Sequence, residues 1–275
     1  MAFFNSQAKK LAPFSPSKLS TLARCELQTH YRYILRFKEA DIPENLRVEV
    51  DDRAAKVGTA LHRVSELMSE GSDLDSSVTT AVKEGELKGE AATDVKIYKH
   101  TVSNFQDRLR SFKEAYSITM ELREVDLAVD FNLEPCSYWS KNAALRGKSD
   151  CILLSEDGST AVIIDLKSSK KATLRYAADQ LEFYSLMVFV NFPKVKTVRN
   201  GLFFLKQGQM LWSPKVLKRD EYDLTESNAL ISKINNLSQA FLGRHMPSIS
   251  TSPLCNFCMY KGLCDSEVRS RKNQT

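Results

Sequence analysis

The sequence predicts an α/β or α+β domain with a mixed sheet that helices flank, and three observations lead to this fold class. Apolar and polar residues alternate over residues 125–131, which is typical of a strand with one buried face. Two expected strands, at residues 145–154 and 161–167, contain apolar runs at 151–154 and 162–164. They flank an acidic Glu-Asp-Gly turn at residues 156–158 and predict a hairpin. Helical periodicity precedes these strands and returns after them, so we expect helices to cover the sheet.

The remaining elements follow in order along the chain. Ser15 and Pro16 supply a capping hydroxyl and a first-turn proline, which predict a helix that runs to about residue 35. The other expected elements are, by residue range, helices at 53–68 and 94–116, a weak helix with loops at 70–92, a helix at 174–190, a strand at 201–205 and an amphipathic helix at 230–241.

Composition bounds the class of protein. The chain has 275 residues, 43% of them hydrophobic and 27% charged, which allows one large domain or a core with a small appendage. No apolar run approaches the ~20 residues that span a bilayer, and the first residues do not resemble a secretory signal. We therefore expect no membrane partner and a cytoplasmic location. The net charge of +5 permits a polyanionic partner without requiring one.

The triplet Asp165-Leu166-Lys167 ends the second strand of the predicted hairpin. Alternate side chains of a strand share a face, so Asp165 and Lys167 project together. A carboxylate that holds a cation, beside a lysine that orients or deprotonates a nucleophile, suits metal-dependent hydrolysis. Two similar triplets, at residues 86–88 and 94–96, lie in polar helical surroundings, where a solvated ion pair is the simpler interpretation.

Asp150, on the first strand of the hairpin, supplies a second acid, because the hairpin can bring it near Asp165. Two adjacent carboxylates repel unless a cation neutralises them, and oxygen ligands favour Mg²⁺ or Mn²⁺. His62, on the helix at 53–68, would shift the preference toward Mn²⁺, and Glu66 one turn later could orient its imidazole. The alternatives are a turn aspartate with a strand-edge ion pair, and a structural or surface histidine.

Polar and basic side chains follow the triplet. Gln180 and Tyr184 lie one helical turn apart and can both hydrogen-bond a phosphate or a base. Lys170, Lys171 and Arg175 precede them and suit phosphate neutralisation beside the metal site. A partly buried polar stripe and a solvated basic face are the corresponding structural alternatives.

The acidic set resembles a known family. Its ordered motifs are Gly58-x-x-x-His62, Gly147-x-x-Asp150, Asp165-x-Lys167 and Gln180-x-x-x-Tyr184. Together they resemble the RecB-type nuclease branch of the PD-(D/E)XK superfamily across roughly residues 53–205. The resemblance implies a restriction-endonuclease-like fold in which Lys167 is catalytic with the two aspartates and Gln180 and Tyr184 shape the DNA-facing side. It implies that the metal is held by His62, Asp150, Asp165 and the Leu166 carbonyl.

Six cysteines give a second pattern, and three of them, Cys255, Cys258 and Cys264, lie close together near the C-terminus. In a cytosolic chain a metal site is a better interpretation than disulfides. With Cys25 far upstream, the three resemble the iron–sulfur staple of a subset of the family that includes the AddB nuclease domain and the Cas-type exonucleases of CRISPR systems. This resemblance favours a 4Fe-4S cluster, with zinc as the alternative for four thiolates.

The two patterns predict three segments and one activity. Residues 1–50 would carry the first cluster cysteine, 51–245 the nuclease core and 246–275 the remaining cluster ligands. We expect a Mg²⁺- or Mn²⁺-dependent DNA exonuclease that acts on single-stranded ends in recombination or repair. The alternatives are a non-catalytic DNA-binding or assembly subunit of a recombination or CRISPR adaptation complex, and a structure-specific endonuclease. No Gly-x-x-x-x-Gly-Lys-Ser/Thr motif occurs, so a helicase partner would have to be another chain.

Overall fold

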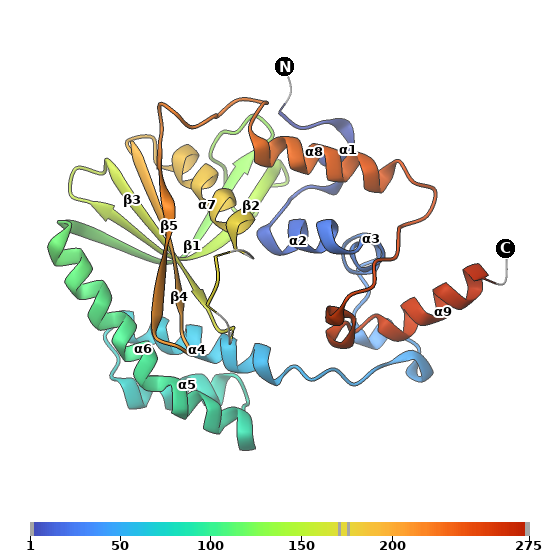
Figure 1. Cartoon of the computed structure of the whole chain (residues 1–275), viewed down its shortest axis with the longest axis horizontal. Coiled ribbons are helices and arrows are strands. Elements are labelled where there is room, and N and C mark those ends of the chain that lie inside the picture. The colour runs from blue at the N-terminus through green and yellow to red at the C-terminus, as the bar shows by residue number, and fades with distance from the viewer. Residues whose placement is uncertain (1–2, 170–171, 175–176, 273–275) are drawn as a thin grey trace. The chain divides into compact units, whose positions relative to one another are not determined.

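Five strands form one mixed sheet (Figure 1). In this computed structural model the strands are, in chain order, β1 (Ile118–Asp130), β2 (Ala143–Ser155), β3 (Thr160–Lys167), β4 (Thr197–Phe204) and β5 (Gln209–Lys218). They lie in the sheet in the same order, and neighbours run antiparallel except for the parallel pair β3 and β4. The predicted mixed sheet is confirmed, and it has one strand, β5, that we did not expect.

The structure describes residues 3–169, 172–174 and 177–272, which fold into two units. The first unit contains Arg53–Leu230 and holds the sheet. The second combines Phe4–Asp52 with the chain from Ile231 onward. Each unit has a hydrophobic core of its own.

Helices cover both faces of the sheet in the first unit, and strand alternation decides which residues meet them. Three helices, α4 (Arg53–Ser69), α5 (Leu74–Glu84) and α6 (Gly89–Ala115), share a core with Cys151, Leu153, Ile164 and Leu166. On the other face, α7 (Ala178–Asn191) makes the crossover between β3 and β4 that parallel strands require. Because side chains alternate, Asp165 and Lys167 face α7 rather than the three-helix layer.

The boundaries of several elements differ from those expected. β1 begins at Ile118, seven residues earlier than the alternating stretch predicted, and α6 begins at Gly89. β5 was missed because most of its side chains are half-buried or exposed, which leaves no clear hydrophobic period. Within the described residues no helix is long and apolar enough to cross a membrane.

The second unit corrects one expectation. The predicted continuous helix from Pro16 to about residue 35 is broken at Cys25, where the backbone is extended with φ −155° and ψ 110°. The Cys25 sulfur accepts a hydrogen bond from the Gln28 amide at 3.5 Å and so caps the next helix. The result is α2 (Pro16–Arg24), then α3 (Glu26–Thr29), then a π-helical turn over His30–Ile34.

N-terminal and C-terminal segments are joined inside this second unit. Its remaining helices are α1 (Ser6–Leu11), α8 (Ala229–Leu242), which begins at the boundary between the units, and α9 (Lys261–Lys272), with short helical turns at Glu39–Asp41, Glu44–Leu46 and Pro253–Phe257. Leu27, Tyr31, Ile42 and Tyr260 form a small buried core. The Tyr260 hydroxyl donates to the Phe37 carbonyl at 2.7 Å, so the C-terminal segment packs directly on the N-terminal one.

Gly201 provides a test of the sheet, because its partner across β4 and β5 is Trp212. A Cβ at position 201 would lie 2.8 Å from two carbons of the indole. We expect Gly201→Ala to lower the free energy of unfolding by about 1–3 kcal/mol, although alanine ordinarily stabilises a strand relative to glycine. Urea unfolding measures the loss. In a Trp212→Ala background the same change should cost nothing further, and an equal cost in both backgrounds would contradict the proposed clash.

Candidate active site

The register of β2 and β3 brings Asp150 and Asp165 to the same place. The last paired residues are Cys151 and Ile164, and one further step along both strands reaches the two aspartates. The ladder does not continue there. Instead, Asp150 Oδ2 accepts a hydrogen bond from the Leu166 amide at 2.6 Å, so a side chain replaces the backbone acceptor. Both carboxylates therefore lie on the α7 face, as the hairpin predicted.

Asp165 is held in a closed polar network. Its side chain is buried, and Gln180 Nε2 donates to Asp165 Oδ1 at 2.6 Å. Lys167 Nζ donates to Gln180 Oε1 at 2.6 Å and lies 2.6 Å from Asp165 Oδ2. The contact to Oδ2 is an ion pair without the directionality of a hydrogen bond. Gln180 thus orients both members of the Asp165–Lys167 pair.

The charges at this site leave a surplus of negative charge. Burial, and then the nearby Asp150 carboxylate, raise the pKa of Asp165 to about 6, although Lys167 opposes the shift. Burial lowers the pKa of His62, but the Asp150 carboxylate and other acidic neighbours outweigh this effect and raise it. A divalent cation would stabilise the ionised carboxylates.

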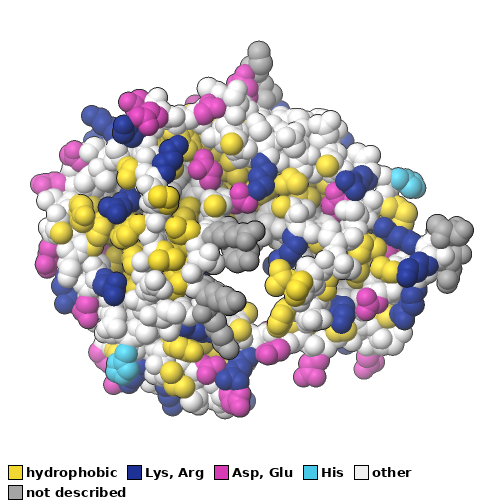
Figure 2. All heavy atoms as spheres, viewed as in Figure 1, with side chains coloured by type: hydrophobic (Ala, Val, Ile, Leu, Met, Phe, Trp, Pro, Cys, Tyr) yellow, Lys and Arg dark blue, Asp and Glu magenta, His cyan; other side chains and the backbone are white. Residues whose placement is uncertain are grey.

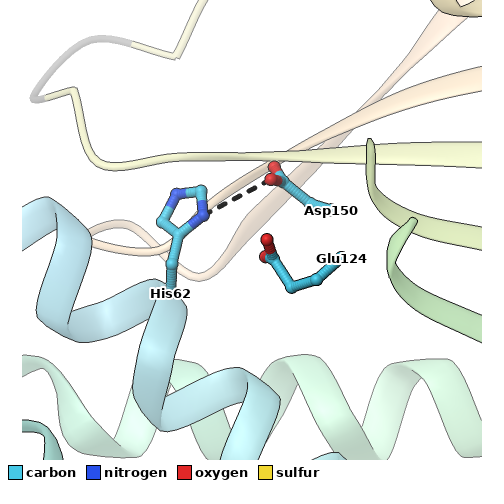
Figure 3. A group of neighbouring side chains, drawn as sticks. All are labelled: His62, Glu124 and Asp150. Atoms are coloured by element: carbon cyan, nitrogen blue, oxygen red, sulfur yellow. Dashed lines mark ion pairs between the residues drawn. The ribbon is translucent and has the colours of Figure 1, made fainter. Parts of the chain in front are cut away.

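A second group of ligand atoms converges from three elements. His62 from α4, Glu124 from β1 and Asp150 from β2 each offer one ligand atom, and these atoms all lie within 4.8 Å of one another (Figure 3). His62 Nδ1 is 3.5 Å from Asp150 Oδ1. The three line an open cleft of about 360 Å³. One imidazole nitrogen with carboxylate oxygens fits Mn²⁺ or Mg²⁺, so these residues suit the divalent metal that the motifs imply.

Glu66 does not orient His62 as expected. Its carboxylate accepts from Arg63 at 2.7 Å. The position of His62 depends instead on a close approach of α4 to the segment after β3. A Cβ on Gly58 would overlap the Ser168 side chain, so glycine lets the helix lie against that segment one turn before His62.

Glu124 is a site residue that the sequence did not reveal. In the β1–β2 register it stands opposite Asp150, and its backbone has a φ of +49°, a left-handed conformation that is uncommon for glutamate. Burial, and then Asp150, raise its pKa, and Lys148 Nζ lies 3.2 Å from its carboxylate. The alternation beginning at Val125 indicated the strand. No pattern in the sequence indicates the left-handed backbone conformation of Glu124, the residue before that alternation.

Tyr184 ties α7 to β2. The Tyr184 ring is buried, and its hydroxyl donates to the Lys148 carbonyl at 2.6 Å. Burial, followed by the Asp165 charge, raises its pKa, so the hydroxyl stays protonated as a donor. The other residues expected to bind DNA, Lys170, Lys171 and Arg175, lie outside the described residues.

Four cysteines, one near the N-terminus and three near the C-terminus, line the same cavity in the second unit. Cys25, Cys255, Cys258 and Cys264 all line one cavity of about 310 Å³. Burial raises the pKa of Cys258 and, together with the neighbouring cysteines, that of Cys264 to about 11. Cys151 is fully buried in the sheet and Cys136 lies in the loop after β1, so both belong to the first unit.

Comparison with protein families identifies one match. The model of the PD-(D/E)XK nuclease superfamily matches residues 13–265. Among solved structures, SSO0001 matches with a TM-score of 0.40 and 11% identity over 92% of this chain and 85% of that protein. A candidate exonuclease from Eubacterium rectale matches with a TM-score of 0.48 and 12% identity over 89% and 86%. No curated protein matches the chain in sequence.

The ligand set predicts a stability response to metal. At Mn²⁺ a hundredfold above its Kd, linkage adds about 2.7 kcal/mol, so we expect the melting temperature to rise by roughly 5 °C. Asp150→Asn should lose most of this rise, because Asp150 is a charged ligand that belongs both to the pair with Asp165 and to the group with His62 and Glu124. Thermal melts in chelator and in Mn²⁺ measure the difference. Glu86→Gln, in one of the surface triplets, is the matched control. An undiminished rise in Asp150→Asn would exclude Asp150 as a ligand.

Proposed function

Because the chain belongs to the PD-(D/E)XK nuclease superfamily, we propose that it is a deoxyribonuclease that uses Mg²⁺ or Mn²⁺ and degrades DNA from single-stranded ends. The observation that carries the proposal is the convergence of Asp150, Asp165 and Lys167 at one end of the β2–β3 ladder, with His62 facing them. A protein that only bound DNA would have no use for a lysine paired with a buried carboxylate beside a second acid.

The proposed ligands are His62, Asp150, Asp165 and the Leu166 carbonyl, with Glu124 added by its position. When bound, a divalent cation neutralises charge on the scissile phosphate. Lys167 is the proposed catalytic base or water-orienting group, because its Nζ lies 2.6 Å from the buried carboxylate of Asp165, a proposed metal ligand. Gln180 keeps Lys167 and Asp165 at a fixed separation through its two hydrogen bonds.

Two features bear on the proposed substrate. The motifs that resemble the RecB-type branch favour DNA. On the face drawn in Figure 2, Lys and Arg side chains are interspersed with Asp and Glu instead of forming one basic surface, and the net charge is only +5. A net charge this small does not favour the tight, sequence-independent binding to duplex DNA that depends on many phosphate contacts. Recombination or repair is the proposed setting, in which a separate helicase would supply the ends.

The activity test compares residues of the buried site with a surface triplet. With either metal, we expect Asp165→Asn and Lys167→Ala to lower the cleavage rate of end-labelled single strands by about 10²–10⁴-fold, because each removes a group from the reacting centre. Lys96→Ala, in the helical triplet, should cut like the wild type.

Circular single strands should resist cleavage if the enzyme needs an end. Cleavage of circles at the same rate would indicate an endonuclease. Tight binding without cleavage in either metal would favour the non-catalytic DNA-binding subunit instead.

A 4Fe-4S cluster is the proposed occupant of the cysteine cavity in the second unit. All four thiols line the same cavity of about 310 Å³, which supports a group held by four thiolates. The resemblance favours a 4Fe-4S cluster, and zinc is the alternative for such a ligand set. Such a cluster would join the N-terminal residues 1–50 to the C-terminal residues 246–275.

Anaerobic purification tests the cluster. We expect a brown protein with broad absorption near about 400 nm and equimolar iron and acid-labile sulfide. Cys255→Ser should lose the colour and lower the melting temperature of the second unit, whereas Cys136→Ser should retain both. A colourless protein that contains zinc would support the alternative.

A further inference from the structure

The loop between β1 and β2 exposes an aromatic side chain that no core contact explains. Trp139 is 77% exposed, more than any other large hydrophobic residue in the described part of the chain. Exposing an indole to this extent gives up hydrophobic stabilisation that burial would provide, and such residues commonly mark interaction sites.

Trp139 is held in place by its neighbours. The Tyr138 and Trp139 ring centroids lie 5.0 Å apart with an interplanar angle of 80°, an edge-to-face arrangement. The Arg146 guanidinium lies 5.5 Å from the Tyr138 ring and 5.6 Å from the Trp139 ring. Arg146 makes no ion pair with any carboxylate among the described residues, so its charge is available to an anion.

The same strand connects this aromatic group with the acidic cleft. Arg146, Lys148 and Asp150 alternate along β2 and share a face, while the residues between them are buried. At about 3.3 Å per residue, Arg146 and Asp150 are about 13 Å apart along the strand, a span of about two nucleotides. Burial and the charges of Asp165 and Asp150 are the larger causes of the raised pKa of Tyr184 on α7, and Tyr138 adds to it. This contribution indicates that the loop between β1 and β2 lies near α7.

From this arrangement we propose that Tyr138, Trp139 and Arg146 form a stacking platform for an unpaired base of the DNA strand that enters the active site. The inference rests on the proposed nuclease function and specifies how the substrate is recognised. An exposed indole stacks on the π-face of any base, and the adjacent guanidinium neutralises a phosphate. Lys148 is already paired with Glu124, so Arg146 is the cation of this row that a phosphate can recruit.

The platform selects for single strands because duplex bases are already stacked on one another. A phosphate held by Arg146 would lie about 13 Å along β2 from Asp150. Stacking does not depend on hydrogen bonds to base edges, so the platform predicts little sequence preference.

Binding in metal-free buffer tests the proposal without cleavage. The probes are labelled oligo(dT) and a duplex of equal length. Fluorescence anisotropy measures their binding to the 275-residue chain purified under anaerobic conditions. We expect Trp139→Ala to weaken oligo(dT) binding about tenfold or more and duplex binding by less than about twofold. Trp139→Phe should retain most of the affinity. Tyr116→Ala, an exposed aromatic outside the loop, should bind like the wild type.

A second measurement reports the contact directly. The chain has two tryptophans, so Trp212→Phe leaves Trp139 as the sole indole fluorophore. We expect oligo(dT) to quench its emission. Unchanged oligo(dT) affinity in Trp139→Ala, or equal losses for oligo(dT) and duplex, would overturn the platform while leaving the nuclease function intact. A wild-type protein that neither binds nor cuts DNA would overturn the proposed function, and the platform with it.

Discussion

The antiparallel register between β2 and β3 is the constraint on which the site depends. Ile152 and Ile163 are paired and fully buried on the α7 face, whereas Cys151 and Ile164 are buried in the core with α4, α5 and α6. A slip of one residue would exchange the side chains that pack against the two helical layers. The same slip would send Asp150 to the opposite face from Asp165. Hydrophobic burial therefore sets the position of the two carboxylates, although neither carboxylate contributes to that burial.

The carboxylates of the site repel one another, and this repulsion lowers the stability of the first unit. Asp165 is buried beside Asp150, and the compensating contacts come from Lys167 and Gln180. Glu124 adds a third carboxylate from a left-handed backbone position. Strain and like charge in one place reduce stability, and they persist where a ligand or a reaction requires them. A divalent cation that relieves the repulsion accounts for this arrangement better than a structural ion pair does.

The second unit presents a different problem, because its core is small. Leu27, Tyr31, Ile42 and Tyr260 provide little apolar burial, and the segments that contribute them are far apart in the chain. A cross-link between such segments stabilises the folded state mainly by restricting the unfolded chain, and the effect grows with the length of the closed loop. The proposed cluster would act at the place where the N-terminal and C-terminal segments meet.

What the sequence by itself determined were features with a local cause. Alternation identified part of β1, apolar runs identified β2 and β3, and the turn joined them. The apolar strand context of Asp165 separated its triplet from the other two. In the structure Asp94, from one of those, pairs with Arg53 at 2.8 Å. The period of a strand is encoded by neighbouring residues, so these features could be predicted without knowledge of the fold.

Only the tertiary structure decided which distant residues complete the site. The left-handed backbone of Glu124, the network through Gln180 and the break of the N-terminal helix at Cys25 depend on partners or backbone angles that no local pattern encodes. The same holds for β5, whose partly exposed surface has no hydrophobic period. The chain's local patterns thus placed Asp150, Asp165 and Lys167 on predicted strands, while long-range packing determined what surrounds them.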